Sequence, residues 1–144
     1  MTTVSEQILT DYLSASVNGR PVEIDTDYTT STDTTTLHTI TASSSVAIDQ
    51  IWLKVWNNDT ARHVITLVLN PSGNATTTPV DAASVKFSLA PQAWTWLLEG
   101  ERFRGIVSGP YTIAAYSTTT AAVTNKYLRA LGWFNRLTQA TVTP

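Results

Sequence analysis

The sequence predicts an all-β protein, an antiparallel two-sheet sandwich of jelly-roll or immunoglobulin-like topology. Three observations favour this fold class. Threonine, a β-branched residue that suits strands, occurs 26 times among 144 residues. Short apolar segments with period-2 alternation recur at intervals of roughly 8–14 residues. No helical segments separate these strands, as they would in a parallel α/β sheet.

Composition narrows the class of protein further. The length of 144 residues suits one sandwich domain, which we place at 20–144, after an N-terminal arm or short helix at 1–19. The net charge of −2 argues against nonspecific nucleic-acid binding, and no apolar run is long enough to span a membrane. Only 14% of the residues are charged, so charge repulsion does little to prevent this surface from associating with other proteins. A Thr-rich monomer and a subunit of an assembly both fit.

The N-terminal segment is the one helical candidate. Thr3 and Glu6 have the spacing of a capping box. Four apolar side chains then share one helical face, and we expect them to dock on a neighbouring protein: Ile8, Leu9, Tyr12 and Leu13. A terminal arm of this kind often needs a partner surface to become ordered. Deletion of residues 1–16 is therefore expected to leave the sandwich folded.

The strands follow in order along the rest of the chain. We expect them at residues 21–25, 37–41, 46–56, 62–69, 85–89, 94–98, 111–116 and 126–137. Residues 46–69 form a long hairpin around Asn57–Thr60, and residues 101–104 are a connection or short edge strand. Residues 25–36 are a polar loop. The side chains expected to face the core are Ile51, Leu53, Val55, Ile65, Leu67, Leu69, Val85, Phe87 and Leu89.

The residues that could carry chemistry form no convergent set. No nucleophile motif lies near His38 or His63, and we interpret each as a structural or an exposed strand histidine. The chain has no cysteine, which excludes disulfides and thiolate-bound metals. Three acids cluster in the polar loop: Asp25, Asp27 and Asp33. The spacing of Asp25 and Asp27 resembles the start of a calcium-binding loop, but the Gly at its sixth position and the Glu at its twelfth are absent. We therefore expect no catalytic residues, no metal and no cofactor.

The tryptophans are the most unusual side chains. In the strand pattern Trp52 and Trp56 share the face of Lys54, opposite the aliphatic face, and Trp94 and Trp96 share another face. Such rows are either buried by a second layer, or exposed as anchors of a protein interface or as platforms for sugar rings. All three interpretations remain open at this point.

The C-terminal segment Gly132–Thr138 reads G-W-F-N-R-L-T and resembles the "G-Y-V-N-R-I-T" ending of a family of small virion proteins of tailed bacteriophages. Thr36–Thr39 resembles the family's early "T-L-H-T" strand, and Ile48–Leu53 resembles its "D-E-V-W-L" strand. The resemblance continues, in order, at Val55–Asn58, Leu98–Gly100 and Tyr111–Tyr116. It covers about residues 20–138, and the segments 3–16 and 25–35 depart from it.

The resemblance implies a structural role on or near a phage head. The role that fits best is a capsid decoration (cement) protein, made in the host cytoplasm, that binds the outer surface of the mature lattice. Its partners would be the major capsid protein and copies of itself, as a trimer, with Trp52, Trp56, Trp94 and Trp96 as anchors between subunits. The alternatives are a neck or tail accessory protein and a carbohydrate-binding β-sandwich module.

Overall fold

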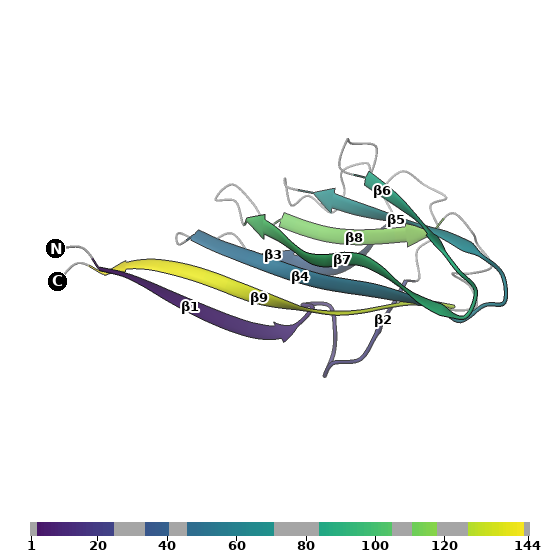
Figure 1. Cartoon of the computed structure of the whole chain (residues 1–144), viewed down its shortest axis with the longest axis horizontal. Helices are drawn as coiled ribbons and strands as arrows, with labels where there is room; N and C mark the ends of the chain where they lie inside the picture. Colours follow the sequence, from purple (N-terminus) through teal and green to yellow (C-terminus); the bar gives the residue numbers. More distant parts are fainter. Residues whose placement is uncertain are drawn as a thin grey trace.

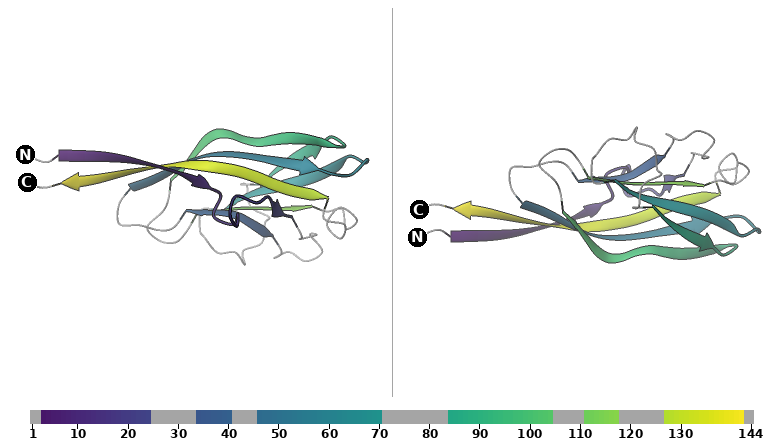
Figure 2. Two further views of the ribbon diagram at one scale, coloured as in Figure 1. Left: turned by 90° about the horizontal axis from the view of Figure 1, so that it is seen from below. Right: turned by 90° about the horizontal axis from the view of Figure 1, so that it is seen from above.

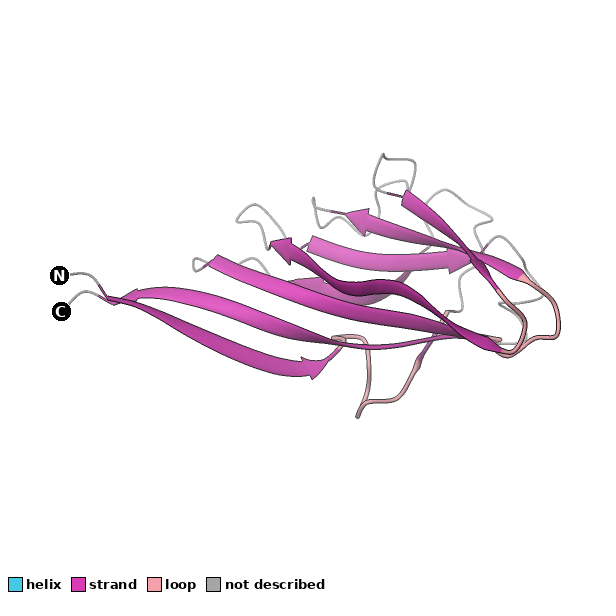
Figure 3. Cartoon of the chain, viewed as in Figure 1, coloured by secondary structure: helices cyan, strands magenta, loops and turns pink. Residues whose placement is uncertain are grey.

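The computed structural model describes residues 3–24, 34–40, 46–70, 84–104, 111–117 and 127–142, and within them every regular element is a strand. Figures 1 and 3 show these strands and the position of both termini at one end of the molecule. The strands are β1 (Thr3–Tyr12), β2 (Val22–Glu23), β3 (Thr35–Ile40), β4 (Val46–Asn57), β5 (His63–Asn70), β6 (Ser84–Leu89), β7 (Ala93–Arg104), β8 (Tyr111–Ser117) and β9 (Leu128–Val142).

The strands form two antiparallel sheets that pack face to face, which confirms the predicted sandwich (Figure 2). One sheet has the order β1-β9-β4-β7, with β2 paired to the same β9 beyond the end of β1. The other has the order β3-β8-β5-β6. Without β1, this leaves eight strands in two sheets ordered 2-9-4-7 and 3-8-5-6, which is the jelly-roll arrangement. The strand order therefore decides between the two topologies that the sequence left open.

The predicted hairpin over residues 46–69 is wrong. Both of its strands exist, but β4 pairs with β7 and β9, while β5 pairs with β6 and β8 in the other sheet. The connection between them crosses the sandwich, and the buried Asn57 holds it by donating from Nδ2 to the carbonyl oxygens of Ala61, Leu89 and Ala90. A turn signal in the sequence marks where a strand ends, but it does not say which sheet the chain enters next.

The predicted helix in the N-terminal segment is also wrong, because residues Thr3–Tyr12 form β1. β1 pairs with β9 in an unbroken register from Thr3 opposite Val142 to Tyr12 opposite Trp133. A single helix of this length is marginal in water, whereas a strand beside β9 completes ten residue pairs. The two strands extend together beyond the rest of the sandwich as a ribbon (Figure 1).

The core lies between the two sheets and confirms most of the inward-facing residues. Ile51, Leu53, Val55, Ile65, Leu67 and Leu89 are at most 1% exposed, and Leu69 and Phe87 pack partly buried against them. Val85 does not belong to this set, because it is 46% exposed on β6, the edge strand of its sheet. The segments predicted at 94–98 and 101–104 are one strand, β7, with Gly100 at a register shift and a φ of 90°.

Candidate docking surface on the tryptophan face

Five tryptophans from three neighbouring strands lie together on the outer face of the five-stranded sheet. We call this surface, with the lysine among them, the tryptophan face: Trp52, Lys54 and Trp56 of β4, Trp94 and Trp96 of β7, and Trp133 of β9. The strand register explains the grouping, because Trp52 is paired with Trp133, Trp56 with Trp94, and Lys54 with Trp96. Two rows that the sequence placed on separate strands therefore form one surface.

The side chains of the tryptophan face contact one another closely. The rings of Trp52 and Trp133 are stacked, with centroids 6.0 Å apart and an interplanar angle of 14°. Trp96 meets Trp133 edge-on at 5.9 Å. Trp56 and Trp94 are tilted against each other at 5.4 Å. These contacts hold the indole rings in fixed positions relative to one another, so the surface is already formed in the isolated chain.

The tryptophan face is open to solvent. Trp94, Trp96 and Trp133 keep 43%, 39% and 36% of their surface exposed. Contiguous exposed aromatic area on a soluble protein is typical of a site that binds another surface. Trp133 and Phe134 are neighbours on β9 and face opposite sides of the sheet, Trp133 outward and Phe134 into the core. The exposed aromatic candidates predicted from the sequence did not include Trp133.

Lys54 gives this aromatic surface a positive charge at its centre. Its Nζ lies 4.5 Å from the ring centroid of Trp94 and 5.4 Å from that of Trp96, within cation–π range. Within the described part of the chain, no carboxylate lies within ion-pair distance of this ammonium. A partner that covers the indoles also covers the ammonium, so it must supply an acceptor there.

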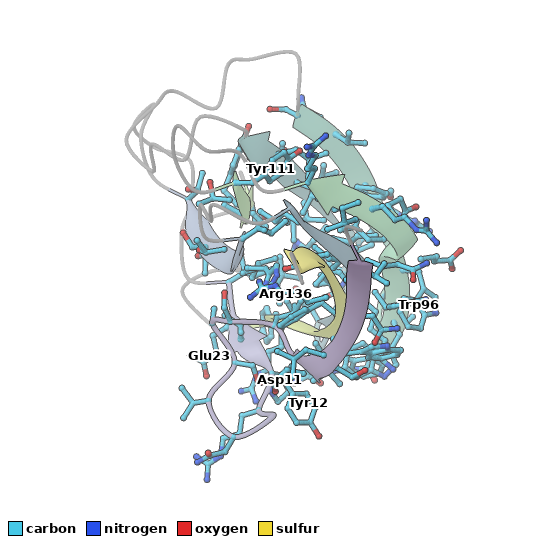
Figure 4. All side chains as sticks on the ribbon, turned by 90° about the vertical axis from the view of Figure 1, so that its left-hand side faces the viewer. Asp11, Tyr12, Glu23, Trp96, Tyr111 and Arg136 are labelled. Atoms are coloured by element: carbon cyan, nitrogen blue, oxygen red, sulfur yellow. The ribbon has the colours of Figure 1, made fainter. Side chains whose placement is uncertain are left out.

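On the inner side of the same sheet, Asp49 links two cationic or polar side chains in the interior. Its carboxylate accepts hydrogen bonds from Arg136 Nε at 2.7 Å and Arg136 Nη2 at 2.8 Å. His38 Nε2 lies 2.8 Å from Asp49 Oδ2, and His38 Nδ1 accepts from the Ser14 N–H at 3.1 Å. Because Nδ1 accepts, Nε2 carries the ring proton, and the Nε2–H group donates a hydrogen bond to the Asp49 carboxylate. Figure 4 shows Arg136 pointing between the sheets and Trp96 on the outer side.

The charges of this buried network are matched. Burial alone would raise the pKa of Asp49, but the hydrogen bonds from Arg136 and His38 outweigh it and hold the pKa below its ordinary value. The hydrogen bond with Asp49 in turn raises the pKa of Arg136. Asp49 and His38 are at most 1% exposed, so no substrate reaches them in this arrangement. The network therefore links the two sheets, because His38 lies on β3 of one sheet, and Asp49 and Arg136 lie on β4 and β9 of the other.

The residues expected to form a docking arm do not share a face. Leu13 is 2% exposed and belongs to the core, whereas Leu9 and Tyr12 are each 54% exposed on β1. The side chain of Ile8 lies outside the described residues. Tyr12 borders a shallow hollow of about 370 Å³ that it lines with Thr10, Asp11 and Trp133. The tryptophan face thus continues to β1 through Trp133 and Tyr12.

Other potential centres of chemistry are few in the described part of the chain. His63 Nε2 lies 2.7 Å from Asp59 Oδ2 across the β4–β5 connection, and this hydrogen bond lowers the pKa of Asp59. No group of three metal-ligating side chains occurs among the residues described, and none of their elements is a helix able to cross a membrane. Asp25, Asp27 and Asp33 lie outside them.

Comparisons with known proteins give a structural likeness at low sequence identity. No protein-family model matches the chain, and no curated protein matches it. Among solved structures, a chain of the structure of infectious bursal disease virus Gx strain is similar, with a TM-score of 0.47 and 15% sequence identity. The likeness covers 92% of this chain and 32% of that chain. A likeness at this level carries no conclusion about function.

Proposed function

We propose that this protein is a virion structural protein that decorates the head of a tailed bacteriophage. It would bind the outer surface of the mature capsid lattice through the tryptophan face. The observation that carries the proposal is this preformed, exposed aromatic surface, with the Lys54 ammonium over two of its rings and no carboxylate beside it among the described residues. Partners of the chain would be the major capsid protein and further copies of itself.

The buried network supports the resemblance on which the phage assignment rests. His38 lies in the segment similar to "T-L-H-T", Asp49 in the segment similar to "D-E-V-W-L", and Arg136 in the segment similar to "G-Y-V-N-R-I-T". These three segments are far apart in the sequence, yet their polar side chains meet around one carboxylate. Motifs that meet in one contact network are expected if the resemblance reflects a shared fold.

The proposed mechanism is stabilisation by mass action. A subunit that binds the mature lattice, and not its disassembled parts, adds its binding free energy to the lattice. Because many copies bind one lattice, a modest binding free energy per copy adds up to a large stabilisation of the lattice. A carboxylate of the capsid protein would form an ion pair with the Lys54 ammonium. This ion pair would fix the orientation of the docked subunit, because burying a charge without a partner costs free energy.

Co-sedimentation with heads that were assembled without this chain tests the proposal. The wild-type protein should bind, and the double variant Trp94→Ser/Trp96→Ser should lose binding while it remains folded, because both side chains are exposed. Val64→Ser is the matched control, since Val64 is 40% exposed on the other sheet. Undiminished binding of the double variant, or loss of binding in the control, would contradict docking through the tryptophan face.

A neck or tail accessory protein could use the same surface, and copy number distinguishes it from a decoration protein.

A carbohydrate-binding module is less well supported. Sugar rings stack on open indole faces, and here Trp52 and Trp133 each cover one face of the other, while Lys54 lies over Trp94 and Trp96, so fewer indole faces are left open. Addition of glycans should therefore leave the tryptophan fluorescence unchanged.

A further inference from the structure

None of the described strands pairs with the outer side of the β1 backbone. β1 is the outermost strand of the five-stranded sheet, with β9 on one side and no described strand on the other (Figure 1). A row of unpaired N–H and C=O groups on such an edge is a template for another strand. This edge is ten residues long, so it is the natural place to ask what pairs with it.

The alternation of hydrogen bonds shows which groups face the free side. Leu13 N–H donates to the carbonyl oxygen of Gly132, so odd-numbered residues of β1 direct their backbone groups at β9. The even-numbered residues, from Val4 to Thr10, direct theirs away from it. The N–H of Tyr12 is capped by the Asp11 carboxylate at 2.8 Å, which marks the end of the open row.

The other edge of the sheet is protected in a way that β1 is not. β7 carries Glu99, Glu101, Arg102 and Arg104, and its pairing with β4 shifts register twice. Charges and bulges of this kind discourage further strand pairing. β1 contains no Lys, Arg, Pro or Gly, and its register with β9 is unbroken. Among the described strands, β7 therefore combines charges of both signs with two register shifts, whereas β1 carries two acids, Glu6 and Asp11, and no register shift.

We infer that β1 pairs antiparallel with β1 of a second copy, about a two-fold axis perpendicular to the sheet. This axis leaves each side chain on the same face of the sheet in both copies, and directly opposite residues of paired strands share a face. Even-numbered residues must therefore pair with even-numbered residues, and odd with odd. The register centred on Ile8 pairs residues 4–12 of both copies. It puts Glu6 opposite Thr10 and Asp11 opposite Ser5, so no two acids face each other.

The two-fold pairing also explains why a second copy suits this edge. Because the axis is perpendicular to the sheet, the tryptophan faces of both copies point to the same side of one continuous sheet. The dimer then presents two docking surfaces to one target, and the second contact forms at a high effective concentration. The pairing itself rests on the edge of β1, whereas the benefit of two docking surfaces rests on the proposed function. The pairing predicts a dimer in solution, whereas the resemblance implied a trimer.

Native mass as a function of concentration tests this inference. From roughly 1 µM to 1 mM, light scattering should show a transition from the 15.7 kDa chain to twice that mass. Ile8→Pro removes an N–H on the free side only, which edge strands tolerate, so it should stay monomeric with an unchanged thermal midpoint. Ile8→Thr, which keeps the N–H and the β-branched shape, is the matched control and should dimerise.

Hydrogen exchange tests the same pairing without a variant, in case Ile8→Pro fails to fold. The backbone N–H groups of Glu6, Ile8 and Thr10 should be protected only at concentrations at which the dimer forms, whereas those of Gln7 and Leu9 should be protected at all concentrations. A chain that stays monomeric over the whole range overturns the inference. So does a trimer, or a dimer whose mass and exchange pattern Ile8→Pro leaves unchanged.

Discussion

At the scale of single residues, Asp49 is the side chain on which the interior depends most. It is 0% exposed and holds both Arg136 and His38. Asp49→Asn leaves the buried part of Arg136 without its counter-charge, so we expect the free energy of unfolding to fall by about 3–5 kcal/mol. Denaturant unfolding measures this loss.

The exposed ion pair of Glu23 and Arg129 gives the matched control for that measurement. Its charged atoms are 3.7 Å apart, and both side chains are at least 40% exposed. Glu23→Gln should therefore change the free energy of unfolding by less than about 1 kcal/mol. An equal effect of the two substitutions would show that the Asp49 network contributes no more than a surface pair.

The lowered pKa of Asp49 makes stability depend on pH. A carboxyl group whose pKa is lower in the folded than in the unfolded protein stabilises the fold above the unfolded pKa, about 3.9 for Asp. This contribution is lost as the pH falls through the folded pKa. The thermal midpoint should decline as the pH falls below about 4, and the decline should be smaller in Asp49→Asn. Parallel pH profiles of the two proteins would contradict this.

Residue types and spacing predicted part of the site but not its full extent. The sequence placed Trp52 and Trp56 opposite the aliphatic face of their strand, and the structure confirms it. It could not place Trp133 beside them, because that contact depends on the register between β4 and β9, which are far apart in the chain. Nor could it bring His38, Asp49 and Arg136 together, for the same reason.

At the scale of elements, β1 shows where a local pattern misleads. The capping-box spacing and the apolar stripe of residues 3–13 satisfy a helix, but pairing with β9 supplies hydrogen bonds that a short isolated helix cannot match. The interval between strands predicted the other elements well. Their distribution between two sheets was not predictable, because each turn leads equally well to a neighbouring strand or across the sandwich.

Deletion variants check the revised role of the N-terminal segment. Removal of residues 1–16 takes away the core residue Leu13 and the Ser14 N–H that binds His38, so it should destabilise the fold by at least about 2–5 kcal/mol, as for loss of a buried leucine. Removal of residues 1–8 leaves both groups in place and should leave a folded protein. Circular dichroism and thermal unfolding separate the two outcomes.

Gly132 is the position in β9 that tolerates no side chain. A Cβ there would overlap the carbonyl oxygen of Trp52 and press against the Cα of Leu53. Both are backbone atoms of β4, which cannot move without breaking the sheet. Gly132→Ala should therefore lower the free energy of unfolding by about 1–3 kcal/mol or more. A thermal midpoint equal to that of the wild type would show that the two strands separate more easily than their register suggests.

At the scale of the whole molecule, the jelly roll places the core and the proposed docking surface on opposite sides of one sheet. The inner sides of both sheets supply the core, and the outer side of one sheet carries the tryptophan face. Substitutions on that face should therefore change binding with little effect on folding, whereas substitutions at the Asp49 network should do the reverse. This division lets binding and stability be tested by different variants of the same chain.

Electron microscopy of heads incubated with the purified protein tests the proposed function most directly. The heads should be assembled without this chain, so that every added copy is visible as new density. We expect density over the outer lattice, at a copy number comparable to that of the major capsid protein, with the tryptophan face turned toward the capsid. Density confined to the neck or tail, or a tryptophan face turned to solvent, would contradict the proposal.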